Sequence, residues 1–95
     1  MMIKIVKLIT GEELIGDVTK TGGVYTIKQP CAIQLMPSHA DPSKTMIGLI
    51  PYASYTENFS IDVHEERAIW IEPPAKELYN QYNSAFGSGI QLAGM

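Results

Sequence analysis

The sequence is poor in the residues that build metal sites and covalent cross-links. Its 95 residues include one cysteine, Cys31, and two histidines, His39 and His64. A single cysteine excludes an internal disulfide and a multi-cysteine zinc site, and it suits a reducing cytoplasm, where we expect this protein. Neither histidine has a partner at metal-ligand spacing, and no HExxH or CxxC motif is present. We therefore expect no bound metal and no cofactor.

Long apolar runs are also missing. No uninterrupted apolar stretch approaches the ~20 residues that cross a bilayer. Lys4 and Lys7 interrupt the first ten residues, so we expect neither a signal peptide nor a membrane partner. The hydrophobic fraction of 45% and the charged fraction of 18% are ordinary for a globular chain, and the length leaves room for one domain.

The usual signatures of catalysis are not found either. Cys31 follows Pro30 in an expected strand with no histidine-plus-acid pattern nearby, so we interpret it as a small core residue. The pairs Glu12–Glu13 and Glu65–Glu66 are sequence neighbours, and neighbours in a strand or turn point apart. The sequence contains neither GxGxxG nor a phosphate-binding loop. These observations predict that the protein is not an enzyme.

What the sequence does contain is a series of β-branched and alternating segments between turn residues. They cover residues 3–10, 14–19, 24–36, 46–50, 58–63 and 68–71. The first has apolar residues on both faces, which predicts a strand covered on both sides. Gly16 lies in mid-strand and indicates strong curvature, while Pro30 marks a bulge, edge or kink.

A different periodicity follows these segments. After Pro73 and Pro74, apolar residues recur at helical spacing: Leu78, Tyr82, Ala85 and Phe86. Gly87 suits the C-terminal cap of this helix. The predicted fold is all-β: a small, five-stranded, strongly bent antiparallel barrel with one C-terminal helix, since closure removes vulnerable edges. We expect a barrel over residues 1–73, a helix over 74–87 and a short tail over 88–95, in one domain.

Charge and aromatic content leave the ligand open. The net charge of −3 argues against a nucleic-acid binder, although residues 1–28 hold four lysines and three acids, whereas residues 29–95 hold three basic residues and seven acids. Five aromatic residues fall in or beside expected strands: Tyr25, Tyr52, Tyr55, Phe59 and Trp70. They suit either a stacking platform for single-stranded nucleic acid or packing in the core and between subunits.

Two stretches resemble the Sm-like family. The pattern Val6-x-Leu8-x-x-Gly11-x-x-Leu14-x-Gly16-x-Val18 resembles the family's first conserved segment. The stretches Lys7–Gly16 and Leu78–Gly89 are similar to small Sm-like proteins of tailed phages that infect cyanobacteria. This resemblance implies five bent strands, with a variable loop near residues 37–45 and a tight turn at 64–67.

The resemblance also implies a ring made of copies of this chain. Sm-like subunits pair the fourth strand of one copy with the fifth strand of the next, and here those strands would be 46–63 and 67–72. The expected interface residues are apolar: Met46, Ile47, Leu49, Ile50, Ile69, Trp70 and Ile71.

In this family, RNA contacts come from the loops that correspond to residues 21–26 and 64–67. The residues expected to contact RNA are Tyr25, Thr26, His64 and Arg67. The family's aspartate and asparagine are absent from Thr21–Thr26, and its basic-residue–glycine pair is replaced by His64–Arg67. Three hypotheses therefore stand: a ring that binds single-stranded RNA, a non-catalytic protein-interaction scaffold ring that has lost RNA binding, and a monomeric barrel with another ligand.

Overall fold

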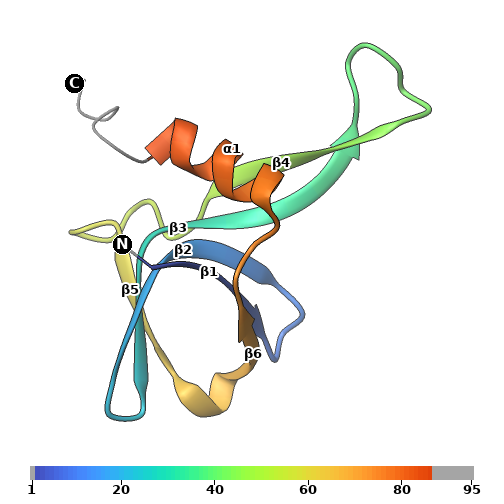
Figure 1. Cartoon of the computed structure of the whole chain (residues 1–95). Helices are drawn as coiled ribbons and strands as arrows, with labels where there is room; N and C mark the ends of the chain where they lie inside the picture. The colour runs from blue at the N-terminus through green and yellow to red at the C-terminus, as the bar shows by residue number, and fades with distance from the viewer. Residues whose placement is uncertain (1, 87–95) are drawn as a thin grey trace.

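A single curled antiparallel sheet with one helix forms the fold. The computed structural model describes residues 2–86. The elements are β1 (Ile3–Leu8), β2 (Glu13–Thr21), β3 (Val24–Pro37), β4 (Thr45–Pro51), β5 (Ser60–His64), the 3₁₀ turn η1 (Glu65–Arg67), β6 (Ala68–Glu72) and α1 (Lys76–Phe86). The strand order is β4-β3-β2-β1-β6, and β5 also pairs with β3. The predicted small all-β fold with one C-terminal helix is confirmed (Figure 1).

The sheet has six strands because the expected fourth strand, residues 46–63, is divided into β4 and β5. β3 pairs with β4 along Cys31–Pro37 and with β5 along Val24–Lys28. Residues 52–59 form a loop between these two partners. The sheet is bent but open: within residues 2–86, no ladder joins β5 to β6. β5 pairs with β3, β6 pairs with β1, and η1 connects the two edges (Figure 1).

Gly16 is the point where the sheet bends. The β2–β3 register shifts between Ile15 and Asp17, which places Gln29 and Pro30 opposite Gly16 as a β-bulge. A Cβ atom on Gly16 would lie 2.6 Å from Ile27 Cγ2 and 2.8 Å from the Lys28 carbonyl oxygen, so only glycine fits this close approach. The curvature predicted from Gly16 is confirmed. Of the bulge, edge or kink predicted at Pro30, the structure shows the bulge.

Both faces of the bent sheet carry a hydrophobic core. Inside the curl lies one buried cluster: Val6, Leu14, Val18 and Ile27. Between the other face and α1 lies the second: Ile3, Ile15, Cys31, Leu78 and Tyr82. β1 contributes to both clusters, which confirms a first strand covered on both sides. The strand ends at Leu8, however, so Ile9 is 52% exposed and does not continue the face of Ile3 and Ile5.

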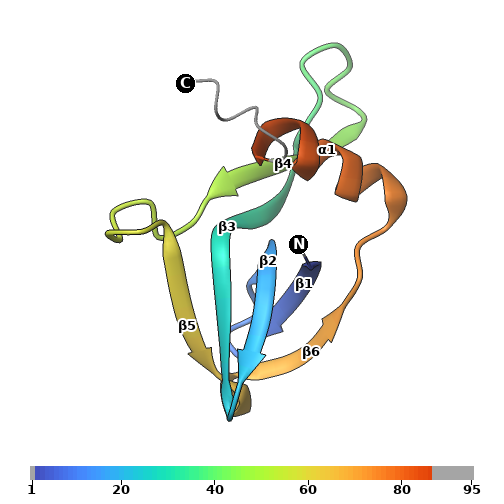
Figure 2. The ribbon, with the colours of Figure 1, turned by 60° about the vertical axis from the view of Figure 1, so that its left-hand side comes forward.

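α1 covers the second cluster and lies beside the β3–β4 hairpin (Figure 2). The helix begins at Lys76, two residues later than predicted. Leu78 and Tyr82 are buried and Phe86 packs beside them, whereas Ala85 is exposed. The predicted cap Gly87 and the predicted tail 88–95 lie outside the described residues. Within residues 2–86, no helix combines the length and the apolar character that a membrane span requires.

Candidate binding site and sheet edges

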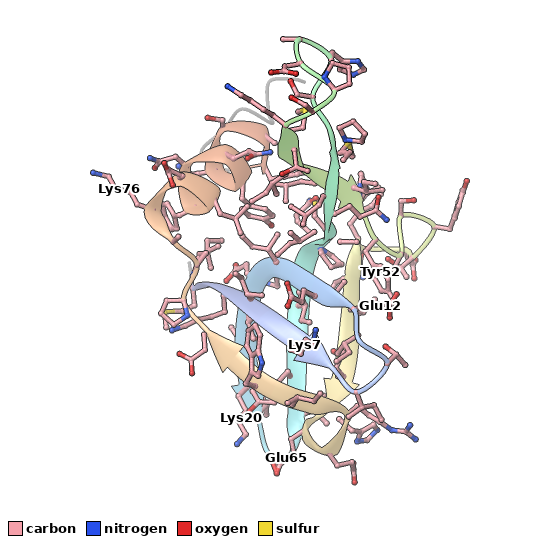
Figure 3. The ribbon with its side chains drawn as sticks, turned by 90° about the vertical axis from the view of Figure 1, so that its right-hand side faces the viewer. Lys7, Glu12, Lys20, Tyr52, Glu65 and Lys76 are labelled. Carbon is pink, nitrogen blue, oxygen red and sulfur yellow. The ribbon has the colours of Figure 1, made fainter. Side chains whose placement is uncertain are left out.

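The two loops expected to form the binding site lie side by side at one end of the molecule. The backbone N–H of Glu65 donates to the carbonyl oxygen of Gly23 at 2.8 Å, which joins η1 to the β2–β3 turn. Figure 3 shows Lys20 and Glu65 together at this end. We call the surrounding group of side chains the hairpin-tip cluster: Lys20, Tyr25, Thr26, Asp62, His64 and Glu65.

Lys20 is engaged twice in the hairpin-tip cluster. Its Nζ lies 3.3 Å from Glu65 Oε1 and 5.5 Å from the centre of the Tyr25 ring. A cation over an aromatic face is attracted by the ring quadrupole. The Tyr25 ring also packs against the core inside the curl. One face of this aromatic ring is therefore covered by Lys20, whose charge is partly neutralised by Glu65.

Thr26 and His64 also have acidic neighbours. The Thr26 hydroxyl donates to Asp62 Oδ1 at 2.7 Å across the β3–β5 ladder. His64 Nδ1 lies 3.9 Å from Glu66 Oε1, and both of these side chains are exposed. Lys20, Thr26 and His64 thus each have an acidic neighbour.

Arg67 lies at the far end of η1 from Glu65 and outside the hairpin-tip cluster. Its backbone carbonyl accepts a hydrogen bond from the N–H of Ile9 at 2.9 Å, at the end of β1. The structure therefore places Tyr25, Thr26 and His64 at one end of the molecule, with Tyr25 on the core face of the sheet and Thr26 and His64 on the opposite face. Arg67 lies beside β1.

Sequence reasoning missed Lys20 and Asp62. Lys20 is the direct cross-strand partner of Tyr25 in the hairpin that turns at Gly22 and Gly23. Counting back across that turn is a signal that could have found it. Asp62 faces Thr26 through the β3–β5 register, and no local signal in the sequence specifies that register.

The expected interface residues divide into two groups. Met46, Ile47, Ile50, Ile69 and Trp70 are exposed, and Ile69 has 58% of its surface free. Leu49 and Ile71 instead pack against the chain's own two cores. The exposed group lies on β4 and β6, the first and last strands of the sheet order.

Cys31 is a core residue, as predicted. It lies between the sheet and α1 in the cluster that contains Tyr82. Burial disfavours the thiolate and raises the pKa of Cys31 to about 11. A thiol with this pKa is a poor nucleophile at neutral pH.

Within residues 2–86, the chain has no pocket and no group of three or more His, Cys, Asp or Glu residues placed to hold a metal ion. Comparisons with protein-family models and with curated proteins found no match for the sequence.

Proposed function

We propose that this chain is a self-assembling, non-catalytic subunit of an Sm-like ring that serves as a protein-interaction scaffold. The observation that supports this most strongly is the pair of sheet edges at β4–β5 and at β6, which pair with other strands on one side only within residues 2–86. The edge of one copy would pair with the other edge of the next. Such a head-to-tail contact closes into a ring when the rotation between copies permits it.

The side chains beside these edges support assembly. Ile69 and Trp70 on β6, and Met46, Ile47 and Ile50 on β4, are all exposed large apolar residues. Exposed strand edges flanked by apolar side chains are prone to pair with another chain. Burying them in a ring would remove both the apolar surface and the unpaired backbone groups from water.

The electrostatics of the hairpin-tip cluster favour a scaffold over an RNA-binding ring. Lys20 is paired with Glu65, and Thr26 already donates to Asp62. A ring would repeat Glu65 and Glu66 once per subunit, and these carboxylates would repel phosphate. The single cysteine and its burial are compatible with a reducing cytoplasm, that of the host cell if the protein is encoded by a phage.

The experiment that tests the scaffold is a measurement of mass in solution. Static light scattering is expected to give a multiple of the 10.5 kDa chain mass. Ile69→Asp, which buries a charge in the proposed interface, should shift the protein to monomers while circular dichroism stays that of the folded chain. A wild-type chain of 10.5 kDa at all concentrations would contradict the proposal.

RNA binding remains the second candidate, and one specific observation favours it. Lys20 lies over the Tyr25 ring, and an aromatic ring beside a cationic group is a common contact for single-stranded RNA. A fluorescent oligouridine titrated at several salt concentrations tests this. Binding that weakens steeply with salt would support phosphate contacts, and no binding at low salt would exclude this candidate.

A further inference from the structure

The β3–β4 hairpin extends beyond the rest of the sheet as a ribbon of two strands. β2 pairs with β3 only as far as Ala32, whereas β4 pairs with β3 as far as Pro37. We call residues 33–37 and 45–49 the arm. Within residues 2–86 the β3 side of the arm has a strand on one side only, and the arm projects from the body of the molecule (Figure 1). Two-stranded ribbons are marginally stable in water, so a further strand would stabilise the arm.

The register of the arm shows which backbone groups lie on its two edges. Ser38 N–H donates to Lys44 O just beyond the last pair of the β3–β4 ladder. Hydrogen-bonded and non-hydrogen-bonded pairs alternate in an antiparallel ladder, so the next pair inward points its N–H and C=O groups away from the partner strand. These outward groups belong to residues 33, 35 and 37 on β3 and to residues 45, 47 and 49 on β4.

α1 contacts the β4 edge of the arm but leaves the β3 edge open. Gln81 Nε2 donates to the outward carbonyl oxygen of Ile47 at 2.9 Å, the place that an N–H of an added strand would take. In the described part of the chain, the outward N–H and C=O groups of Leu35 have no hydrogen-bond partner, and 73% of this residue is exposed. This β3 edge is separate from the β4–β5 and β6 edges that the proposed ring uses.

The β3 edge also lacks the features that keep exposed strands from pairing. Natural edge strands are commonly protected by charged side chains, above all lysine, or by proline. Residues 31–36 contain neither a charged residue nor a proline, and residues 45–56 carry no charge. Two copies of this edge therefore meet without opposing like charges, although the whole chain has a net charge of −3.

The β3 edge is complementary to a second copy of itself. When two such edges lie antiparallel with Leu35 opposite Leu35, each of the two residues donates its N–H to the carbonyl oxygen of the other. The N–H of Ile33 then faces the carbonyl oxygen of Pro37 in the other copy. Leu35 and Ile47 are direct cross-strand partners and share a face, so this register places four apolar side chains in one row.

We propose that the β3 edge of the arm pairs antiparallel with the same edge of a second copy, about a two-fold axis at Leu35. So short an edge buries less than the ~1,200 Å² of a standard interface, so a single pair of arms is weak. The inference therefore rests on the proposed ring, in which several arms act together on the arms of a second ring. The ring contact is head-to-tail and the arm contact is two-fold, so experiments can separate them.

Two charge variants test the arm contact by light scattering. Leu35→Lys places two like charges opposite each other on the two-fold axis, so the mass should fall to half that of the wild-type assembly. Leu35 is exposed, and circular dichroism should stay that of the folded chain. Gln34→Lys makes the same charge change at the exposed neighbouring position, which lies opposite Met36 of the second copy. This control should keep the wild-type mass.

Cysteine cross-linking locates the two-fold axis. The native Cys31 is buried, so Leu35→Cys carries one accessible thiol. Mild oxidation should give a covalent dimer on a denaturing gel, because the Cα atoms of a hydrogen-bonded antiparallel pair are about 5.5 Å apart, a distance that a disulfide spans. Gln34→Cys should give no dimer, since its counterpart in the second copy lies on a diagonal, about 7–8 Å away.

The outcomes separate this inference from the proposed ring. An oligomer whose mass is unchanged by Leu35→Lys would overturn the arm pairing and leave the ring standing. Equal cross-linking of Leu35→Cys and Gln34→Cys, or none in either, would also overturn it, because a fixed register requires a difference. A monomeric wild-type chain would overturn the ring and, with it, the pairing of its arms.

Discussion

The hydroxyl of Tyr82 donates a hydrogen bond to the carbonyl oxygen of Gln29 at 2.9 Å, and this bond joins α1 to the bend in β3. Gln29 is in the left-handed region, with φ at 52°, because it belongs to the bulge opposite Gly16. The preceding helix residue, Gln81, contacts the edge of β4. Two adjacent residues of one helix thus hold both the bend of β3 and the strand beside it.

Tyr82→Phe tests the contribution of this hydrogen bond to stability. The variant keeps the buried ring and its contact with Phe86 but leaves the Gln29 carbonyl without its hydroxyl donor. We expect the free energy of unfolding to fall by about 1–2 kcal/mol. Urea denaturation followed by tryptophan fluorescence measures it. Tyr79→Phe, at an exposed position of the same helix, should change the stability much less, and equal losses would contradict the assignment.

Gly16→Ala tests the close approach at the bend. The added methyl group would meet Ile27 Cγ2 and the Lys28 carbonyl, so a strand must move. We expect a loss of about 1–3 kcal/mol, the usual cost of inserting a group into a packed site. Gly23→Ala is the matched control because its Cβ would lie 3.7 Å from the nearest atom, in Glu65. Thermal melting of both variants measures the difference, and similar melting temperatures would show that the bend tolerates a side chain.

The buried titratable groups predict a loss of stability at alkaline pH. Burial raises the pKa of Cys31 to about 11, so the folded chain keeps its thiol proton where the unfolded chain, near pH 9, releases it. Burial also raises the pKa of Tyr82, with smaller effects from Cys31 and Asp17. The protonated Cys31 thiol therefore contributes its full stabilisation below pH 9. This contribution is lost as the pH rises towards 11, and the free energy of unfolding falls by up to about 1.4 kcal/mol per pH unit.

Chemical denaturation at pH 8, 9, 10 and 11 measures how the free energy of unfolding changes with pH. Cys31→Ser keeps nearly the same size but has no group that titrates in this range. Its stability should therefore fall less between pH 9 and 10 than that of the native chain. Identical slopes for the two chains would show that Cys31 does not carry the effect.

The bend and the two-sided core could be predicted because each depends on local residue chemistry. Gly16 fits where another backbone comes close, and Pro30 cannot donate to a ladder. The apolar residues of β1 alternate to both faces, and the structure places them in two cores. The apolar face of α1 could be predicted for the same reason, since Leu78 and Tyr82 are one helical turn apart.

The interruption between β4 and β5 could not be predicted in this way. Ala53 and Phe59 both have positive φ values, of 57° and 50°, in the loop that separates the strands. Neither residue type favours that conformation, so no sequence signal marks the loop. The Gln81–Ile47 contact joins residues 34 positions apart and depends on how α1 lies against the sheet. The contact of Asp62 with Thr26 could not be predicted for the same reason, because it depends on the register between β3 and β5.

Glu65→Gln tests the second candidate function from inside the hairpin-tip cluster. The substitution removes the carboxylate that lies 3.3 Å from Lys20 Nζ, which frees the lysine charge for a phosphate. If the cluster contacts single-stranded RNA, affinity at low salt should rise by about 1.4- to fivefold, the range for one exposed charge pair of about 0.2–1 kcal/mol. Fluorescence anisotropy with labelled oligouridine measures the change in affinity.

Glu57→Gln removes an equal charge in the exposed loop before β5 and serves as the control. Equal gains in both variants would mean that net charge alone is responsible, and no gain in either would remove Lys20 from the RNA hypothesis.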